Sequence, residues 1–373
     1  MALGILLTSL MLPAHPAGAA RPLNGDLGAG FNVDAIGLDG RSKEILFQRV
    51  GEVKFGWIRQ QLRWSAYEPA QGQFQNAYAA QVDALVESAS AHGVRIMFSA
   101  VNSPNWAGEG GGLPRNGKDF GQFMSYVANR YKGKVQAYEV WNEQNYAYET
   151  GGLVDVGSYL PVLKSGYKAI KAADPDAFVI FGGLTPTGIK DRPDLALDDV
   201  EYLRQIYKIN NGEVKKYYDV LGVHPGSTCN PPDASWPDDP ATNSCGTDAD
   251  GSRAFTTDNS FYFKRILQVR AVMEKNGEGD KPVWVTEFGW NTTAEPGQGM
   301  DFSRYVTEQQ QAEYIMRAFE IGRSYDWMGV MFVWNLNFQV TVSGTNDEKW
   351  GYGVLRRDWS PRPAFQALKA LND

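Results

Sequence analysis

Apolar stretches, each about as long as a β-strand, recur eight times along the chain, and amphipathic segments with helical spacing lie between them. The apolar stretches are Leu27–Val33, Trp57–Leu62, Val94–Val101, Val135–Trp141, Phe178–Leu184, Tyr218–Val223, Pro282–Phe288 and Gly329–Leu336. Strands that are almost continuously apolar belong to a parallel sheet buried on both faces, and the intervening helices supply the cover. Eight such units predict an α/β fold, a closed (β/α)8 TIM barrel in a single domain.

The helical segments favour the same fold. They are Tyr78–His92, Gly117–Tyr131, Ser158–Ala173, Val200–Ile209, Tyr262–Asn276, Thr307–Tyr325 and Pro363–Leu371. No Gly-x-Gly-x-x-Gly sequence follows the first strand, which removes the main reason to prefer an open, dinucleotide-binding sheet. The length of 373 residues fits one barrel of slightly enlarged size.

The first 19 residues resemble a signal peptide, because an apolar stretch is followed by small residues and by Ala17-Gly18-Ala19, which is similar to a cleavage site. We therefore expect residues 20–373 to form the mature domain and the protein to be secreted, outside the cell or into the periplasm. No other segment has the length of uncharged residues that a membrane span requires.

Two cysteines, Cys229 and Cys245, flank a stretch rich in Pro, Asp and Asn. In an oxidising compartment we expect them to form a disulfide bond across this loop; two buried free thiols are the alternative. A zinc site with His224 is disfavoured, because the spacing matches no usual zinc pattern and a fourth ligand is missing. The segment Asp248-Ala249-Asp250-Gly251 resembles a calcium loop only weakly, since Gly246 stands at the first acidic position. We expect no metal and no cofactor.

The charge of the chain bears on its partners. A net charge of −7 and a pI near 5.2 leave no basic surface for nucleic acid. Neutral sugars are compatible with this charge, and the 11 Trp residues offer faces that stack on pyranose rings. We expect a carbohydrate substrate, no nucleic-acid partner and no obligate protein partner.

Two glutamates stand where buried strands end. Glu143 follows Trp141-Asn142 at the end of the fourth apolar stretch, and Glu287 lies near the end of the seventh. Because the carboxyl ends of barrel strands meet at one face, these two side chains are expected to lie close together. One glutamate that donates a proton and one that attacks carbon are the minimal equipment for hydrolysing a glycosidic bond with retention of configuration. Asn142 is expected to hydrogen-bond a sugar hydroxyl.

Neighbouring charges decide whether this pair can work. An ionised Glu287 on so apolar a strand needs hydrogen-bond donors, which Arg59 or Arg63 on the second strand would supply. Glu139 lies four residues before Glu143 on the same strand and therefore deeper in the barrel, where pairing with an arginine is the expected role.

Several further residues are candidates for contact with a sugar. Trp334 ends the eighth strand, where it would form the floor of the cleavage site, with core packing as the alternative. His224 ends the sixth strand and is either a substrate contact or a structural histidine. The aromatic residues of loops that would form other subsites are Trp106, Tyr146, Tyr148, Trp236, Trp290 and Trp350.

With these residues the chain resembles the clan A glycoside hydrolases, whose acid/base glutamate closes strand four after an asparagine and whose nucleophile closes strand seven. The resemblance rests on Glu-Val-Trp-Asn-Glu-Gln-Asn at 139–145, Trp-Val-Thr-Glu-Phe-Gly-Trp at 284–290, Phe-Gly-Trp-Ile-Arg at 55–59 and the closing segments Gly-Tyr-Gly-Val-Leu at 351–355 and Ser-Pro-Arg-Pro-Ala-Phe at 360–365. It implies that Glu143 is the acid/base, Glu287 the nucleophile and Arg59 a support for Glu287.

Within this clan the chain is most similar to glycoside hydrolase family 39, with the cellulase-like family 5 as a neighbour. One departure concerns the sixth strand, where family members often have His-Pro-Tyr with the tyrosine touching the nucleophile; Gly226 stands in its place. Tyr262 or another loop residue would then take over that role.

The sequence therefore predicts a secreted retaining O-glycoside hydrolase that cleaves β-linked glycans such as xylan or glucan. Two alternatives remain open, namely a catalytically silent carbohydrate-binding barrel and a transglycosylase that uses the same two glutamates.

Overall fold

The computed structural model describes residues 28–226, 228–239, 245, 255–294 and 301–371. Eight parallel strands close into a barrel in the order of the sequence, so the predicted (β/α)8 fold is confirmed. The strands are β1 Gly28–Val33, β2 Trp57–Arg63, β3 Arg95–Val101, β4 Ala137–Val140, β5 Phe178–Leu184, β6 Val220–Val223, β7 Val283–Phe288 and β8 Met328–Val333. Each overlaps one of the eight apolar stretches of the sequence.

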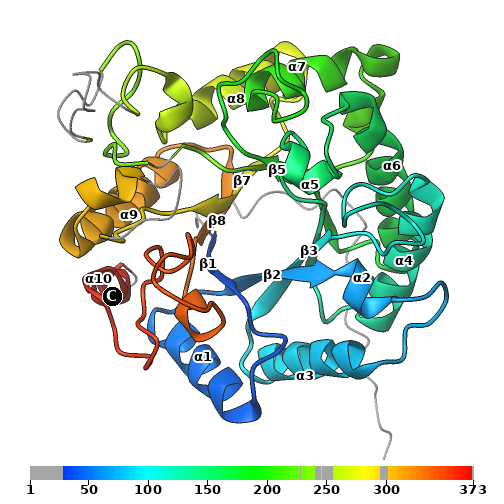
Figure 1. Ribbon diagram of the computed structural model, residues 1–373, viewed down its shortest axis with the longest axis horizontal. Helices are drawn as coiled ribbons and strands as arrows, with labels where there is room; N and C mark the ends of the chain where they lie inside the picture. The colour runs from blue at the N-terminus through cyan, green and yellow to red at the C-terminus, as the bar shows by residue number, and fades with distance from the viewer. Residues whose placement is uncertain (1–27, 227, 240–244, 246–254, 295–300, 372–373) are drawn as a thin grey trace, which may run out of the picture.

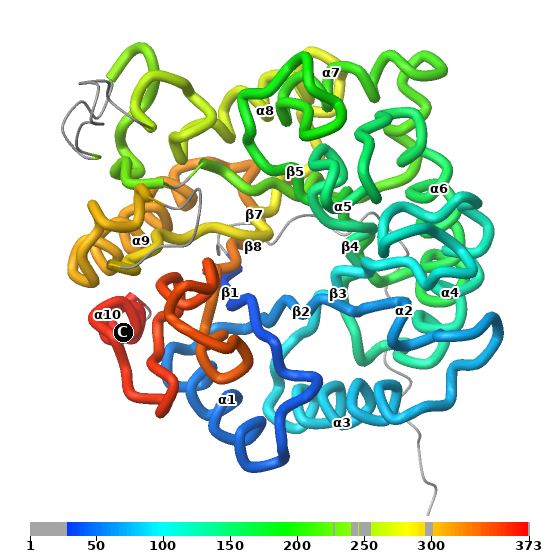
Figure 2. The backbone as a smooth tube through the Cα atoms, in the orientation of Figure 1, coloured from blue at the N-terminus to red at the C-terminus, as the bar shows by residue number. Residues whose placement is uncertain are grey.

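Helices surround the barrel (Figure 1). The α-helices are α1 Gly40–Glu52, α2 Trp64–Tyr67, α3 Ala77–Ala91, α4 Gly117–Arg130, α5 Ala147–Thr150, α6 Val156–Ala173, α7 Asp199–Lys208, α8 Arg265–Lys275, α9 Glu308–Arg323 and α10 Pro363–Ala370, and the 3-10 turns are η1 Ile209–Asn211, η2 Glu213–Lys216, η3 Asn259–Phe261, η4 Asp301–Tyr305 and η5 Phe338–Val340. Figure 2 shows the chain circling once, so that α10 returns beside α1. An ion pair of 3.4 Å between Lys369 and Glu52 joins these two helices. Among the described residues, none of the helices combines the length and the apolar character needed to span a lipid bilayer.

The interior of the barrel changes character along its axis, because side chains two residues apart on a strand point to the same side. The lower layer is apolar and contains Trp57, Met97, Ala137, Ile180, Val220, Trp284, Val330 and Phe332. Two residues further along four of these strands, the inward positions hold the buried polar side chains of Arg59, Ser99, Glu139 and Thr286. The apolar layer closes the bottom of the barrel, and the polar layer lies toward the carboxyl ends of the strands.

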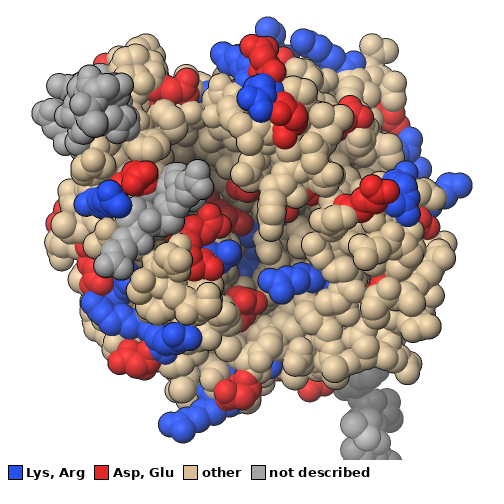
Figure 3. All heavy atoms as spheres, viewed as in Figure 1, with Lys and Arg blue, Asp and Glu red and all other residues tan. Residues whose placement is uncertain are grey.

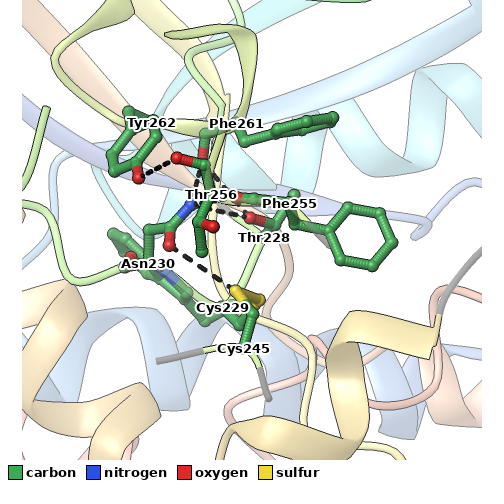
Figure 4. The surroundings of a disulfide bond; sticks show 9 residues. Thr228, Cys229, Asn230, Cys245, Phe255, Thr256, Phe261 and Tyr262 are labelled. Atoms are coloured by element: carbon green, nitrogen blue, oxygen red, sulfur yellow. Dashed lines mark hydrogen bonds between the residues drawn. A yellow bond between two sulfur atoms is a disulfide. The ribbon is translucent and has the colours of Figure 1, made fainter. Parts of the chain in front are cut away.

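The predicted disulfide bond between Cys229 and Cys245 is present. Beside it, the Asn230 side chain donates hydrogen bonds to the carbonyl oxygens of Phe255, at 2.6 Å, and Phe261, at 3.1 Å (Figure 4). The disulfide and Asn230 thereby join the part of the chain that directly follows β6 to the part that precedes α8. The weak calcium-loop resemblance at 248–251 and the signal-like segment 1–19 lie outside the described residues.

Candidate active site

The two predicted glutamates lie together at the carboxyl end of the barrel. Glu143 directly follows the end of β4 and Glu287 belongs to β7. One carboxylate oxygen of each lies within 4.8 Å of one of the other. Their side chains retain 22% and 15% of their exposure, which leaves both in reach of a ligand.

The backbone before Glu143 adopts conformations that side chains other than glycine rarely take. Trp141 has φ 71° and Glu143 has φ 45°, both in the left-handed region. The N–H of Glu143 donates to the carbonyl of Gly183 at 2.9 Å, and that of Trp141 to Ala100 at 3.1 Å. Strain of this kind persists only where neighbours hold it, and it is typical of functional sites. Here it turns the Glu143 side chain toward β7.

Arg59 organises the floor of the site. Its guanidinium donates to Glu287 Oε1 at 2.5 Å, to Glu139 Oε2 at 2.8 Å, to Asn32 Oδ1 at 2.8 Å and to Asn142 Oδ1 at 2.7 Å. The planar fork of an arginine can hold several acceptors at once, which a lysine cannot. Arg59 is only 1% exposed, so it supports the carboxylates from below instead of binding substrate, and of the two candidate arginines it, and not Arg63, is the one that contacts Glu287.

Glu139 has the structural role that its position predicts. It is fully buried, its Oε2 lies 2.6 Å from Arg59 Nη2, and its Oε1 accepts from the N–H of Gly183 at 3.1 Å. These bonds satisfy a buried charge that would otherwise be costly. Glu139 therefore holds Arg59 in place below the pair.

The charges of the floor shape the acid–base properties of the site. Burial would lower the pKa of Arg59, but the charges of Glu139 and Glu287 outweigh it and hold that pKa above its usual value. Burial raises the pKa of Glu287 above its usual value, while the positive charges of His224 and Arg59 oppose the rise. The short contact to Arg59 favours the ionised form of Glu287, as a nucleophile requires.

His224 connects the two glutamates. Its Nδ1 lies 2.8 Å from Glu143 Oε1, and its Nε2 lies 3.0 Å from Thr286 Oγ1 and 3.8 Å from Glu287 Oε1. Burial would lower the pKa of His224, but the charge of Glu287 and the bond to Glu143 raise it above its usual value. The ring is only 5% exposed and lies against Glu143, so of the two predicted roles, a substrate contact and a structural histidine, the burial favours a histidine that positions Glu143.

Glycine at position 183 is a condition of this arrangement. A Cβ atom there would lie 2.5 Å from His224 Nε2 and 2.5 Å from Thr286 Oγ1. Any larger residue would displace the histidine that holds Glu143. The sequence contains Gly182-Gly183 within a buried strand, and this pair was the available signal for a close approach.

Glu143, His224 and Glu287 are close enough to one another for their ligand atoms to share a cation. The hydrogen bonds of these side chains favour acid–base chemistry over metal binding. Both ring nitrogens of His224 lie within hydrogen-bond distance of protein oxygens, and Glu287 is paired with the Arg59 guanidinium, whose positive charge would repel a metal ion. Glu143 and His224 are therefore hydrogen-bonded to each other, and Arg59 holds Glu287 beside them.

A third carboxyl group, which the sequence did not reveal, adjoins the pair. It belongs to Glu149 on α5, which lies near the side chain of Asn142. Burial raises the pKa of Glu149 to about 8, and the negative charges of Glu143 and Glu287 add to the rise. Nothing in the sequence indicated that Glu149 points inward, because it is a single acidic residue on one turn of helix after the Glu143 motif. Asn142 is 3% exposed, and its side-chain oxygen is held by Arg59.

The role of the tyrosine expected after the sixth strand, contact with the nucleophile, is not taken over at position 226 or by Tyr262. A Cβ at Gly226 would collide with the backbone oxygen of Ser260, and the Tyr262 hydroxyl donates to the carbonyl of Thr256 at 2.7 Å (Figure 4). Tyr352, in the segment after β8, is a tyrosine whose phenol interacts electrostatically with Glu143 and Glu287. Burial raises the pKa of Tyr352, and the charges of Glu348, Glu287 and Glu143 raise it further.

The predicted aromatic residues divide between the site and the core. Trp334 is half-buried directly after β8, and its ring packs edge-on against Phe338 at 4.8 Å. Trp106 is half-buried, with its Nε1 donating to the carbonyl of Glu68 at 3.2 Å, and Tyr146 is 36% exposed. Trp290 is corrected to a core residue, because it is 0% exposed.

Trp290 nevertheless stabilises the site indirectly. Its Nε1 donates to the carbonyl of Asn230 at 2.9 Å, which ties the end of β7 to the disulfide-closed segment. The neighbouring Asn291, the first residue of a glycosylation sequon, is 1% exposed, and its side-chain amide donates to the carbonyl of Glu348 at 2.8 Å. An attached glycan at Asn291 is incompatible with these contacts.

The face that carries the pair is hollowed near its centre, and both acidic and basic side chains line parts of the hollow (Figure 3). An open depression at the carboxyl ends of barrel strands is where this fold places catalysis.

The comparisons with known proteins agree with this geometry. The sequence matches the family described as cellulase (glycosyl hydrolase family 5) over residues 28–222, which is just over half of the chain. The chain therefore belongs to the cellulase family of glycosyl hydrolases, within the clan A group that its motifs resemble, and it is a glycoside hydrolase. No curated protein matches the chain by sequence.

Solved structures share the fold at low sequence identity. A family 39 glycoside hydrolase from Bacteroides cellulosilyticus WH2 is similar with a TM-score of 0.65 and 21% identity over 94% of this chain, which spans 63% of that protein. A GH39 β-xylosidase from Caulobacter crescentus gives 0.60 and 18%, over 95% of this chain and 73% of its own. A GH5_18 protein from Streptomyces cattleya, solved in complex with GlcNAc, gives 0.63 and 13%, over 94% and 80%.

Proposed function

We propose that this protein is a retaining O-glycoside hydrolase that cleaves β-linked glycans by double displacement. The observation that carries the proposal is the approach of Glu143 and Glu287, since one oxygen of each lies within 4.8 Å of the other carboxylate. Retaining enzymes hold their two carboxyl groups about 5–5.5 Å apart, whereas inverting enzymes separate them by about 6.5–9.5 Å to admit a water molecule. The observed spacing supports the retaining class.

In the first step the ionised Glu287 attacks the anomeric carbon while Glu143 gives its proton to the glycosidic oxygen. The bond from the anomeric carbon to that oxygen breaks, a glycosyl ester of Glu287 forms, and the leaving sugar departs as an alcohol. In the second step Glu143 takes a proton from water, the water oxygen bonds to the anomeric carbon, and the ester breaks. Two inversions restore the starting configuration.

The surrounding residues suit these two roles. Arg59 donates to Glu287 and favours its ionised form before attack. His224 lies against Glu143, the group that changes its protonation state in both steps. Arg59 fixes Asn142 through its side-chain oxygen, and we expect the amide group of Asn142 to donate to the sugar hydroxyl beside the reacting carbon.

The β-linked substrate class rests on resemblance. The motifs are those of clan A enzymes, and one structural neighbour is described as a β-xylosidase. We therefore expect a β-linked polysaccharide or oligosaccharide of the xylan or glucan type.

We also propose that the protein is exported and acts outside the cell or in the periplasm. The signal-like segment 1–19 motivates this proposal, and a disulfide bond suits an oxidising compartment. Fractionation of the native host, with an antibody against the barrel domain, tests it; protein confined to the reducing cytosol contradicts it.

The test of the activity is product release from a panel of β-linked xylans, glucans, mannans and galactans and from aryl β-glycosides. The protein is compared with Glu287→Gln, which removes the nucleophile at nearly constant size, and with Glu87→Gln, which changes an exposed glutamate on α3. We expect one substrate class to be cleaved, activity to fall at least about 10³-fold in Glu287→Gln, and Glu87→Gln to match the parent. A parent without activity on any substrate, or a fully active Glu287→Gln, contradicts the proposal.

A further inference from the structure

Large apolar side chains are exposed beside the site, on the loops that follow β4 and β5. In the described part of the chain, six large hydrophobic residues are exposed, and four of them lie here: Tyr148 at 80%, Leu153 at 60%, Leu195 at 42% and Tyr146 at 36%. We call these four residues the α5 platform. Exposed apolar groups that gather in one place mark a binding surface more often than scattered ones.

The α5 platform is held rigidly. The N–H of Ala147 donates to the carbonyl of Leu195 at 2.9 Å, that of Val154 to Pro193 at 2.8 Å, and Tyr146 forms a β-bridge with Ala196. The centroids of the Tyr146 and Tyr148 rings lie 6.3 Å apart, with 38° between their planes. Two rings fixed by backbone bonds of two loops can receive a ligand without first being ordered.

A hollow of about 580 Å³ adjoins the platform. The segments that carry Leu153 and Leu195 also form its wall, through Val154, Pro193 and Leu197, and polar side chains such as Gln205 and Lys208 complete the lining. This volume is within the range of sites that bind small organic ligands, and a mixed apolar and polar lining suits the two kinds of surface of a pyranose ring.

The platform is continuous with the catalytic site. The N–H of Tyr146 donates to the carbonyl of Glu143 at 2.8 Å, and the five steps of chain from Glu143 to Tyr148 span at most about 18 Å. A glycan that extends from the catalytic pair toward the segment after β4 would therefore come within reach of these tyrosines. Their phenol rings stack on sugar faces while their hydroxyl groups remain in water.

We propose that the α5 platform and the adjoining hollow form a remote subsite, which binds sugar units of the substrate several positions away from the bond that is cleaved. The inference rests on the proposed function, and it makes the substrate an oligosaccharide or polysaccharide that extends beyond the catalytic pair. A small glycoside, which fills only the cleavage position, gains nothing from this surface.

The first test is chain-length dependence with Tyr148→Ala, Tyr148→Phe and a control, Leu267→Ala, which changes a 40% exposed residue on α8. The substrates are an aryl β-glycoside and β-1,4-linked oligosaccharides of two to six units from the class that the panel identifies. We expect kcat/KM of the parent to rise with length, and Tyr148→Ala to lose roughly 3- to 10-fold on the longest substrates, the size of one stacking contact. Its activity on the aryl glycoside stays within about twofold of the parent, Tyr148→Phe retains the gain with length, and Leu267→Ala matches the parent throughout.

The second test separates binding from chemistry. In the Glu287→Gln background, calorimetry measures the Kd of cello-, xylo- and manno-oligosaccharides of two and six units with and without Tyr148→Ala. Weaker binding of the six-unit chain alone supports the subsite even where the parent shows no hydrolysis, an outcome that would overturn the proposed function instead. An equal loss of affinity for short and long chains, or no loss for either, overturns the subsite and leaves the catalytic proposal intact. Binding of another protein through Tyr148 and Leu153, without an effect of chain length, also overturns the subsite.

Discussion

Replacing Glu149 by glutamine should stabilise the protein at alkaline pH. Burial and the charges of Glu143 and Glu287 raise the pKa of Glu149 from 4.5 to about 8. Between these two values the folded protein keeps a proton on Glu149 that the unfolded chain has already released. The folded state therefore binds more protons than the unfolded state, and its stability falls as pH rises through this window. Glutamine, which does not titrate, removes that loss at nearly the same side-chain size.

The size of the effect follows from the same values. A pKa of about 8 in place of 4.5 corresponds to about 5 kcal/mol, at about 1.4 kcal/mol for each pH unit. This is an upper bound, because water entry and small movements of Asn142 relax the ionised form in a real protein. We expect the free energy of unfolding of Glu149→Gln to exceed that of the parent by about 2–5 kcal/mol at pH 9. At pH 4 this difference should be smaller by the same amount, so that the two proteins are about equally stable.

The assay is urea unfolding of the parent, Glu149→Gln and Glu87→Gln at pH 4, 6, 7.5 and 9, read by tryptophan fluorescence. The advantage of Glu149→Gln should grow between pH 4.5 and 8 and level off above it, while Glu87→Gln follows the parent. Parallel curves for the parent and Glu149→Gln would refute the reasoning, because Glu149 would then titrate alike in the folded and unfolded chain.

Three further perturbations act on other parts of the site. Gly183→Ala places a methyl group against His224 and should lower kcat roughly 10²-fold with little change in secondary structure, measured on an aryl glycoside and by circular dichroism; unchanged kcat would contradict the contact. Arg59→Lys cannot serve the same set of acceptors and should lower kcat by roughly 10²-fold with a smaller change in KM; a change confined to KM would show that Arg59 binds substrate. Replacing Cys229 and Cys245 by serine opens a loop of sequence separation 16 and should lower the unfolding free energy by about 3 kcal/mol, with kcat retained below the transition; equal denaturation midpoints would contradict a stabilising disulfide.

The barrel was largely predictable because its strands are buried on both faces. Such strands are apolar throughout, and eight stretches of strand length can hardly be arranged in another way once helices separate them. Helix α1 was not foreseen, since Leu46, Phe47 and Val50 are its only large apolar residues that face the barrel and they make a weak pattern in a polar segment. Strand ends also differed by a few residues, as at β4, where the apolar stretch runs on into Trp141 and the backbone turns into the left-handed region.

The reacting pair was predictable for a different reason. Glutamates at the carboxyl ends of two buried strands of one barrel must share a face, where the strand ends surround a single site. The supporting shell depends on which side chains meet across the barrel, and the sequence carries that information only where burial leaves one choice. Arg59 and Glu139 lie at inward positions of two apolar strands, where two buried charges satisfy each other by pairing. No such constraint applied to Trp290 and Glu149. Trp290 turned to the core although it follows the nucleophile, and Glu149 turned to the site although its neighbour Tyr148 is exposed.

The central claim is that Glu143 and Glu287 work by double displacement, and the configuration of the first product tests it most directly. Proton NMR of the anomeric region, recorded within minutes of adding the protein to a β-linked substrate from the panel, distinguishes the two anomers before they equilibrate. The account predicts that the β anomer appears first and converts slowly to the equilibrium mixture. Initial release of the α anomer would show inversion by a single displacement and would contradict the role assigned to Glu287.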